Sequence, residues 1–75
     1  MEENVINFLK RLFLWSKVSN KTLIYKMIEV YLPVTVRIIN ESEVLLDFGD
    51  LNDTKVAVFL KFVWDENRLV DIIKG

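Results

Sequence analysis

The chain has 75 residues and a formal net charge of −1, with 52% apolar and 28% charged residues. This length is typical of one domain with a single core, which we expect to span residues 1–75. The sequence has no cysteine and no histidine. Disulfides, the usual zinc sites and acid–base catalysis by imidazole are therefore excluded.

Two segments in the first half, residues 3–18 and residues 21–31, repeat apolar side chains at the spacing of an amphipathic helix. Ser19 or Asn20 is a suitable cap for the second helix, and Pro33 ends it because the residue before a proline avoids helical geometry. The second helix is predicted to bury Leu23, Ile24, Met27, Ile28 and Tyr31 and to expose Thr22, Tyr25, Lys26 and Glu29. The short connection predicts an αα-hairpin or a sharply angled pair.

From residue 34 onward the apolar period changes to two, which is typical of strands. The predicted strands are residues 34–39, 43–48, 55–64 and 68–74, with a longer turn at 49–54. A helix over 66–74 is an alternative, because Leu69, Ile72 and Ile73 also share a helical face. Short links between successive strands predict an antiparallel meander. The expected fold is α+β, with two N-terminal helices packed on one face of a four-stranded antiparallel meander sheet in the order α-α-β-β-β-β.

Strand alternation assigns the side chains to two faces of this sheet. One face is entirely apolar, and we expect the helices to cover it. Its residues are Val34, Val36, Ile38, Val44, Leu46, Phe48, Val56, Val58, Leu60, Phe62, Trp64, Val70 and Ile72. The other face is mixed, and its apolar residues are Ile39, Leu45, Phe59, Val63, Leu69 and Ile73. No third layer is predicted to cover these six, so they form either a docking surface or ordinary scattered surface apolar residues.

Charge is segregated along the chain. Residues 4–28 contain five bases and no acid, whereas residues 29–75 contain five bases and nine acids. The bases of the helical segment are Lys10, Arg11, Lys17, Lys21 and Lys26. A basic helical layer is typical of proteins that bind nucleic acid or an anionic surface. The alternative is that these side chains form the solvated face of amphipathic helices, which the sequence pI of about 5.3 favours over dedicated nucleic-acid binding.

The residue types that catalysis or metal binding requires are missing or poorly spaced. No histidine is present to activate a serine, and with only two glycines there is no glycine-rich phosphate loop. Asp47, Asp50 and Asp53 surround Gly49, but calcium loops place ligands at every second residue, so this cluster indicates turn chemistry. We therefore expect no enzyme activity, no cofactor and no metal.

These patterns predict a non-enzymatic protein-interaction module that forms a homodimer through the second sheet face. Two alternatives stay open: nucleic-acid or anionic-surface binding through the basic helical layer, and a small monomeric inhibitor that docks on a larger protein. The start of the chain is acidic at Glu2 and Glu3, and the longest apolar stretch is interrupted by charges. These features predict neither a secretory signal nor a membrane span, so we expect a cytoplasmic protein.

Overall fold

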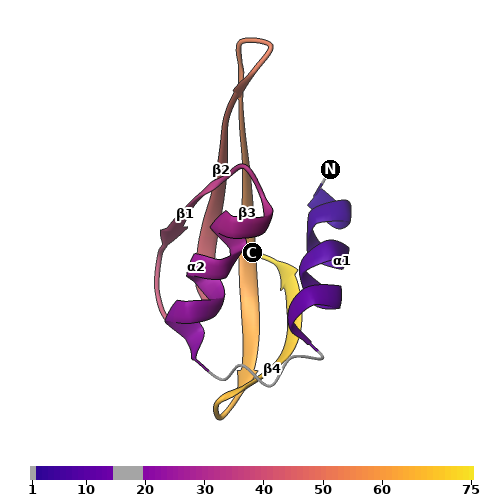
Figure 1. The fold of residues 1–75 in the computed structure, drawn as a ribbon, viewed down its shortest axis with the longest axis vertical. Coiled ribbons are helices and arrows are strands. Elements are labelled where there is room, and N and C mark those ends of the chain that lie inside the picture. Colours follow the sequence, from indigo (N-terminus) through magenta and orange to yellow (C-terminus); the bar gives the residue numbers. More distant parts are fainter. Residues whose placement is uncertain (1, 15–19) are drawn as a thin grey trace.

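The computed structural model describes residues 2–14 and 20–75, and it confirms the expected α+β fold. Its elements are α1 (Glu2–Phe13), α2 (Lys21–Tyr31), β1 (Thr35–Ile38), β2 (Glu43–Leu51), β3 (Thr54–Asp65) and β4 (Arg68–Lys74). The strands form one antiparallel sheet in the order β1-β2-β3-β4 (Figure 1). The helical alternative for residues 66–74 is wrong, since β4 occupies this segment. The part of the predicted first helix beyond residue 14, including Lys17, lies outside the described residues.

The two helices cover separate parts of one sheet face, because α1 packs on β4 and α2 packs on β1 (Figure 1). Each helix has the sheet as its main neighbour, whereas an αα-hairpin, one of the two arrangements predicted, would have packed the helices on each other. Asn20 caps α2 as predicted, because its Oδ1 accepts a hydrogen bond from the Leu23 amide at 3.1 Å. Leu32, which precedes Pro33, is already extended. Neither described helix is long and apolar enough to span a membrane.

The exposed and buried sides of α2 differ from the prediction. Tyr25, predicted to be exposed, is buried, whereas Leu23 and Tyr31, predicted to be buried, are 47% and 49% exposed. The Tyr25 ring meets Phe62 edge-on at 5.1 Å, and its hydroxyl donates a hydrogen bond to the Glu41 carbonyl at 2.8 Å. A hydroxyl that keeps a hydrogen bond can be buried without the usual cost of desolvation. The predicted assignment is therefore wrong for these three residues.

The core lies between the helices and the sheet face that they cover, which we call the inner face. Its buried side chains are Val5, Leu9, Phe13, Ile24, Tyr25, Ile28, Val44, Leu46, Val58, Leu60, Phe62, Leu69 and Ile72. No charged side chain is buried in the described part of the chain. Ile38 was predicted to lie on the covered face, but it ends the edge strand β1 and stays 53% exposed.

β2 and β3 extend past the other strands and form a projecting hairpin (Figure 1). The sequence predicts a longer turn at 49–54, but β2 continues to Leu51 and the hairpin closes with only Asn52 and Asp53. Both closing residues have positive φ, 52° and 62°, as the central positions of a type I′ turn require. Gly49, with a φ of 78°, lies instead at a β-bulge. The molecule is consequently elongated, with extents of 40 × 22 × 21 Å.

A second bulge changes the face on which Leu69 lies. Val63 pairs with Asp71 and Trp64 pairs with Leu69, so Val70 is an extra residue in β4. On the far side of an extra residue, each side chain points to the face opposite to the one that strict alternation predicts. Leu69 is consequently buried in the core at 4% exposure, and Val70 is 39% exposed. Strict alternation predicted the opposite for both residues, and that prediction is wrong.

Candidate functional site

The sheet face away from the helices, which we call the outer face, is the candidate functional site. Alternation around the buried inner residues places five of the six predicted side chains there: Ile39, Leu45, Phe59, Val63 and Ile73. The sixth, Leu69, belongs to the core. Ile39 and Ile73 are 53% and 40% exposed, while the other three are partly buried. Both helices pack on the opposite side, so no described element covers the outer face.

Leu45 and Phe59 form the centre of the outer face. They are register partners on β2 and β3, and side chains directly opposed across two strands contact each other. On its other side Phe59 meets Gly75, whose amide donates a hydrogen bond to the Phe59 carbonyl at 2.8 Å. The Phe59 ring occupies the space that a Cβ at Gly75 would fill. The Phe59 ring therefore packs against the Gly75 backbone on the outer face.

Where β2 and β3 pair, their charged outer side chains form two rows. The β2 row is acidic, with Glu43, Asp47 and Asp50, and the β3 row is basic, with Lys55 and Lys61. The Gly49 amide donates to Asp47 Oδ1 at 2.9 Å, and Arg37 Nη2 of β1 lies 3.4 Å from Asp47 Oδ2. The Gly49 hydrogen bond first, and Arg37 second, lower the pKa of Asp47. These rows were not predicted, although the alternation that predicts the outer face also contains them.

At each edge of the sheet, a carboxylate accepts a hydrogen bond from one backbone amide. Glu29 Oε2 accepts a hydrogen bond from the Val36 amide of β1 at 2.8 Å, and Asp71 Oδ1 accepts one from the Ile72 amide of β4 at 2.8 Å. Lys10 Nζ lies 3.1 Å from Asp71 Oδ1 and, ahead of the Ile72 amide, lowers the pKa of Asp71. Edge amides that already have acceptors are poorer templates for an added strand. One backbone amide at each of these edges is thus already satisfied.

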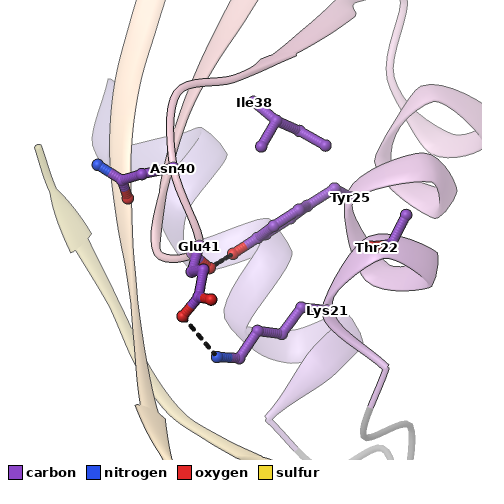
Figure 2. A pocket seen from close by; sticks show the side chains of 6 residues that line it. All are labelled: Lys21, Thr22, Tyr25, Ile38, Asn40 and Glu41. Carbon is purple, nitrogen blue, oxygen red and sulfur yellow. Dashed lines mark hydrogen bonds and ion pairs between the residues drawn. The ribbon is translucent and has the colours of Figure 1, made fainter.

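A polar network fastens α2 to the turn between β1 and β2 (Figure 2). Trp64 Nε1 donates to the Tyr25 hydroxyl at 3.3 Å, and that hydroxyl donates to the Glu41 carbonyl at 2.8 Å. Lys21 Nζ lies 4.0 Å from Glu41 Oε2 and 5.4 Å from the centroid of the Trp64 ring. Burial raises the pKa of Tyr25. This network was not predicted, because the helical spacing assigns Tyr25 to the exposed side of α2.

A hollow of about 330 Å³ lies beside the network, lined by Lys21, Thr22, Tyr25, Ile38, Asn40 and Glu41 (Figure 2). Within residues 2–14 and 20–75, every buried side-chain nitrogen and oxygen has a hydrogen-bond partner. A buried polar atom without a partner would have indicated a group that a ligand satisfies. The network thus stabilises the fold, and the hollow offers no unsatisfied buried group to a ligand.

The basic side chains of the helical segment are spread over the molecule. Lys10 lies at the β4 edge in an ion pair with Asp71, while Lys21 and Lys26 lie on α2, which packs on β1 at the opposite end of the strand order. Arg11 is exposed on α1. Among the described residues these bases do not form one patch, so the nucleic-acid alternative gains no geometric support and stays a prediction.

The aspartates around Gly49 take separate structural roles. Asp47 accepts the Gly49 amide and pairs with Arg37, and Asp53 is a central residue of the hairpin turn. Nowhere in the described ranges do three acidic side chains gather into a possible metal site.

Comparisons with known proteins find no matching family model, no similar curated protein and no similar solved structure.

Proposed function

We propose that this protein is a non-enzymatic protein-interaction module that forms a homodimer through its outer face. The observation that carries the proposal is the uncovered pair of Leu45 and Phe59 at the centre of the sheet, with Val63 on the same face. The chain's own helices cannot shield these side chains, because they pack on the other side of a single sheet. A second copy on this face would remove apolar surface from water, which is favourable by about 25 cal/mol per Å².

The accessible surface of the chain is slightly larger than that of a compact monomer of the same mass. The accessible surface is 5162 Å², about 7% above the roughly 4,800 Å² that size scaling gives for a compact monomer of this mass. The projecting hairpin and the uncovered outer face both contribute to this excess. A standard interface buries about 800 Å² on each partner, which is about a sixth of the surface present here.

A second copy is favoured over an unrelated partner by the charges of the outer face. A two-fold interface uses the same patch on both molecules, so the patch must be complementary to itself. The outer face carries acids and bases together, such as Glu43 and Asp50 beside Lys55 and Lys61. A face of one sign would repel its own copy, whereas this face offers each copy opposite charges.

The titratable groups with shifted pKa values have structural explanations. The described groups of this kind are Tyr25, Asp47 and Asp71. Tyr25 is shifted by burial in the network, and the two aspartates by hydrogen bonds that fasten neighbouring parts of the fold. Catalytic groups are instead shifted in a cleft where substrate can approach them. These shifts therefore agree with a binding role.

Substituting a charge at the centre of the outer face tests the proposal. Phe59→Glu places a carboxylate where the apolar centres of two copies would meet, so the dimer should dissociate. Sedimentation equilibrium over the micromolar range should give a dimeric mass for the native chain and half that mass for the variant. A monomeric native chain at every concentration would overturn the proposal.

A matched variant separates the face from a general effect of charge. Val30→Glu introduces the same carboxylate at an apolar residue of α2 that is 79% exposed and far from the outer face. This control should stay dimeric. Ile73→Glu, at a 40% exposed position on the outer face, should dissociate the dimer without disturbing the contact between Phe59 and Gly75. Far-ultraviolet circular dichroism then confirms that each variant remains folded.

The projecting hairpin favours a second candidate, a monomeric inhibitor that docks on a larger protein. Leu51, beside the two-residue turn, is 51% exposed, and neither β1 nor β4 pairs with this part of the hairpin. A narrow protruding loop on a rigid scaffold is a common way to present binding residues. A monomeric mass for both the native chain and Phe59→Glu would favour this candidate, and dissociation by Phe59→Glu would count against it.

A further inference from the structure

The outer face has a charge pattern that is ordered by strand. Along the paired length of β2 and β3, the charged outer residues of β2 (Glu43, Asp47 and Asp50) are acidic, and those of β3 (Lys55 and Lys61) are basic. Asp65, at the far end of β3, pairs instead with Arg68 of β4. The register joins the two strands in matched pairs: Glu43 with Lys61, Leu45 with Phe59, and Asp50 with Lys55. An acidic row on β2 and a basic row on β3 therefore lie side by side, and the apolar pair of Leu45 and Phe59 lies between the charged pairs along the strands.

The matched charges are not paired within one molecule. Glu43 Oε1 accepts a hydrogen bond from Asn40 Nδ2 at 2.8 Å. In the part of the chain that the structure describes, neither Lys55 nor Lys61 forms an ion pair. Both lysines are exposed on the outer face. The basic row is thus free to meet carboxylates of another molecule.

We propose that two copies pack outer face on outer face about a two-fold axis parallel to the strands, along the line between β2 and β3. This inference rests on the proposed function. Rotation about such an axis leaves each residue at the same height along the strands and exchanges the positions of the β2 and β3 rows. β2 of one copy therefore lies over β3 of the other. Glu43 then faces the partner's Lys61, and Asp50 faces the partner's Lys55.

The same axis also matches the apolar residues. Leu45 faces the partner's Phe59, and because the axis runs between them this contact occurs twice at the centre of the interface. β1 of one copy lies over β4 of the other, which brings Ile39 near the partner's Ile73. Leu45 and Phe59 of both copies then form an apolar centre, with the charged pairs on either side of it along the strands. Face-to-face sheets align their strands within about 30°, and the arrangement requires only that.

The charge rows disfavour the other face-to-face arrangement. A two-fold axis perpendicular to the strands would place β2 over β2 and β3 over β3. Acidic side chains would then face acidic ones, Glu43 close to the partner's Asp47, and the lysines of β3 would lie over the same strand of the other copy. Like charges brought together in an interface oppose binding. The strand-by-strand order of charge therefore selects the parallel axis.

Two charge-reversal variants test this axis. Glu43→Lys puts like charges at both copies of the Glu43–Lys61 contact, and Lys61→Glu does the same with the opposite sign. Each variant alone should dimerise about tenfold more weakly than the native chain, since two contacts are lost. A mixture of the two should form a heterodimer in which both contacts again join opposite charges. Because glutamate and lysine have nearly equal masses, one variant of each mixture is labelled uniformly with the heavy nitrogen isotope, and native mass spectrometry then distinguishes the three dimers by mass.

The mixture isolates the contact between molecules. Within each variant the Glu43–Lys61 register pair has like charges whether the chain is alone or mixed, so its effect on folding cancels. Lys26→Glu and Glu66→Lys, away from the outer face, produce the same changes in net charge and are the matched control pair. That control pair should form homodimers and heterodimers in statistical proportion.

The possible outcomes separate the axis from the proposed function. Preferential heterodimer formation by the outer-face pair alone, weakened by added salt, supports the parallel axis. A native dimer whose outer-face variants mix statistically overturns the axis and leaves homodimerisation standing. A native chain that is monomeric at every concentration overturns both.

Discussion

The inner and outer faces of the sheet are built from the same strands, but they differ in what covers them. On the inner face, Val44, Leu46 and Phe62 are 0% exposed beneath the helices. On the outer face, Leu45 and Phe59 alternate with charged neighbours and stay partly exposed. One strand therefore contributes to folding through one face and, under our proposal, to association through the other. An apolar side chain in a strand can therefore be assigned a role only after the element that covers it has been identified.

The largest expected difference between the two faces is the loss of stability when one phenylalanine ring is removed from each face in turn. Phe62→Ala should lower the free energy of unfolding by about 3–5 kcal/mol, because a fully buried ring leaves a cavity. Phe59→Ala should lower it by about 1–2 kcal/mol in the monomer, because that ring is already partly in water. Denaturant unfolding at low protein concentration measures both values. Should Phe62→Ala not fold, Phe62→Leu provides the buried-face value.

Equal losses from the two substitutions would contradict the distinction between the faces. The two variants should also differ in association. Phe59→Ala should weaken the dimer while the fold persists, and Phe62→Leu should leave the dimer intact at concentrations where it is folded. Sedimentation of the folded variants measures this second difference.

Much of the fold follows from local rules that the sequence displays. The change of apolar period after Pro33 predicts the change from helices to strands, and Asn20 predicts the start of α2. The outer positions Leu45, Phe59 and Val63 follow from alternation alone. The register of β2 with β3 has no shift from Glu43↔Lys61 to Asp47↔Ala57, and the register of β3 with β4 has none from Leu60 to Val63. Local pattern is sufficient wherever the backbone stays regular.

The errors fall where the backbone is irregular or a long-range contact decides. In β4 both phases of alternation contain apolar residues, so only the bulge at Val70 determines that Leu69 is buried. Gly49 resembles a turn residue, but its positive φ serves a bulge. Tyr25 resembles an exposed helix residue until Glu41 and Trp64 supply hydrogen-bond partners from distant parts of the chain. Such contacts have no signal in local spacing.

The polar network gives the next largest expected effect, and it belongs to the inner side. Tyr25→Phe leaves the Glu41 carbonyl and Trp64 Nε1 without their partner, so the free energy of unfolding should fall by about 1–2 kcal/mol. Tryptophan fluorescence should shift as the Trp64 surroundings change. Thermal and denaturant unfolding of the variant and the native chain measure the loss. An unchanged stability would show that the network contributes nothing to holding α2.

The Tyr25→Phe variant should also differ from the native chain in how its stability depends on pH in the alkaline range. Burial raises the pKa of Tyr25 above its ordinary value of 10.0, so the unfolded chain loses the phenolic proton first. The stability that comes from this group is fully present below pH 10.0 and is lost as the pH rises through the folded-state pKa. Tyr25→Phe should lack this alkaline component. Unfolding of the two chains across the alkaline range shows whether their stabilities converge.

The smallest expected effect comes from the outer face and has the opposite dependence on pH. The Gly49 amide and Arg37 hold the pKa of Asp47 below its ordinary value of 3.8. The resulting stability is present above pH 3.8 and is lost as the pH falls through the lower folded-state pKa. In Asp47→Asn the unfolding free energy should therefore depend less steeply on pH in that acidic range. Added salt should reduce the difference between the two chains, because the Arg37 contact is exposed.

The outer position of Asp47 gives this small effect a second use. Under the proposed axis Asp47 lies in the interface, so its surroundings differ between the monomer and the dimer, whereas those of Tyr25 do not. The acidic component should consequently change with protein concentration, and the alkaline component should not. Acid titrations of stability at two concentrations, one below and one above the dimerisation range, make the measurement. An acidic component that is the same at both concentrations would place Asp47 outside the interface and so argue against outer-face association.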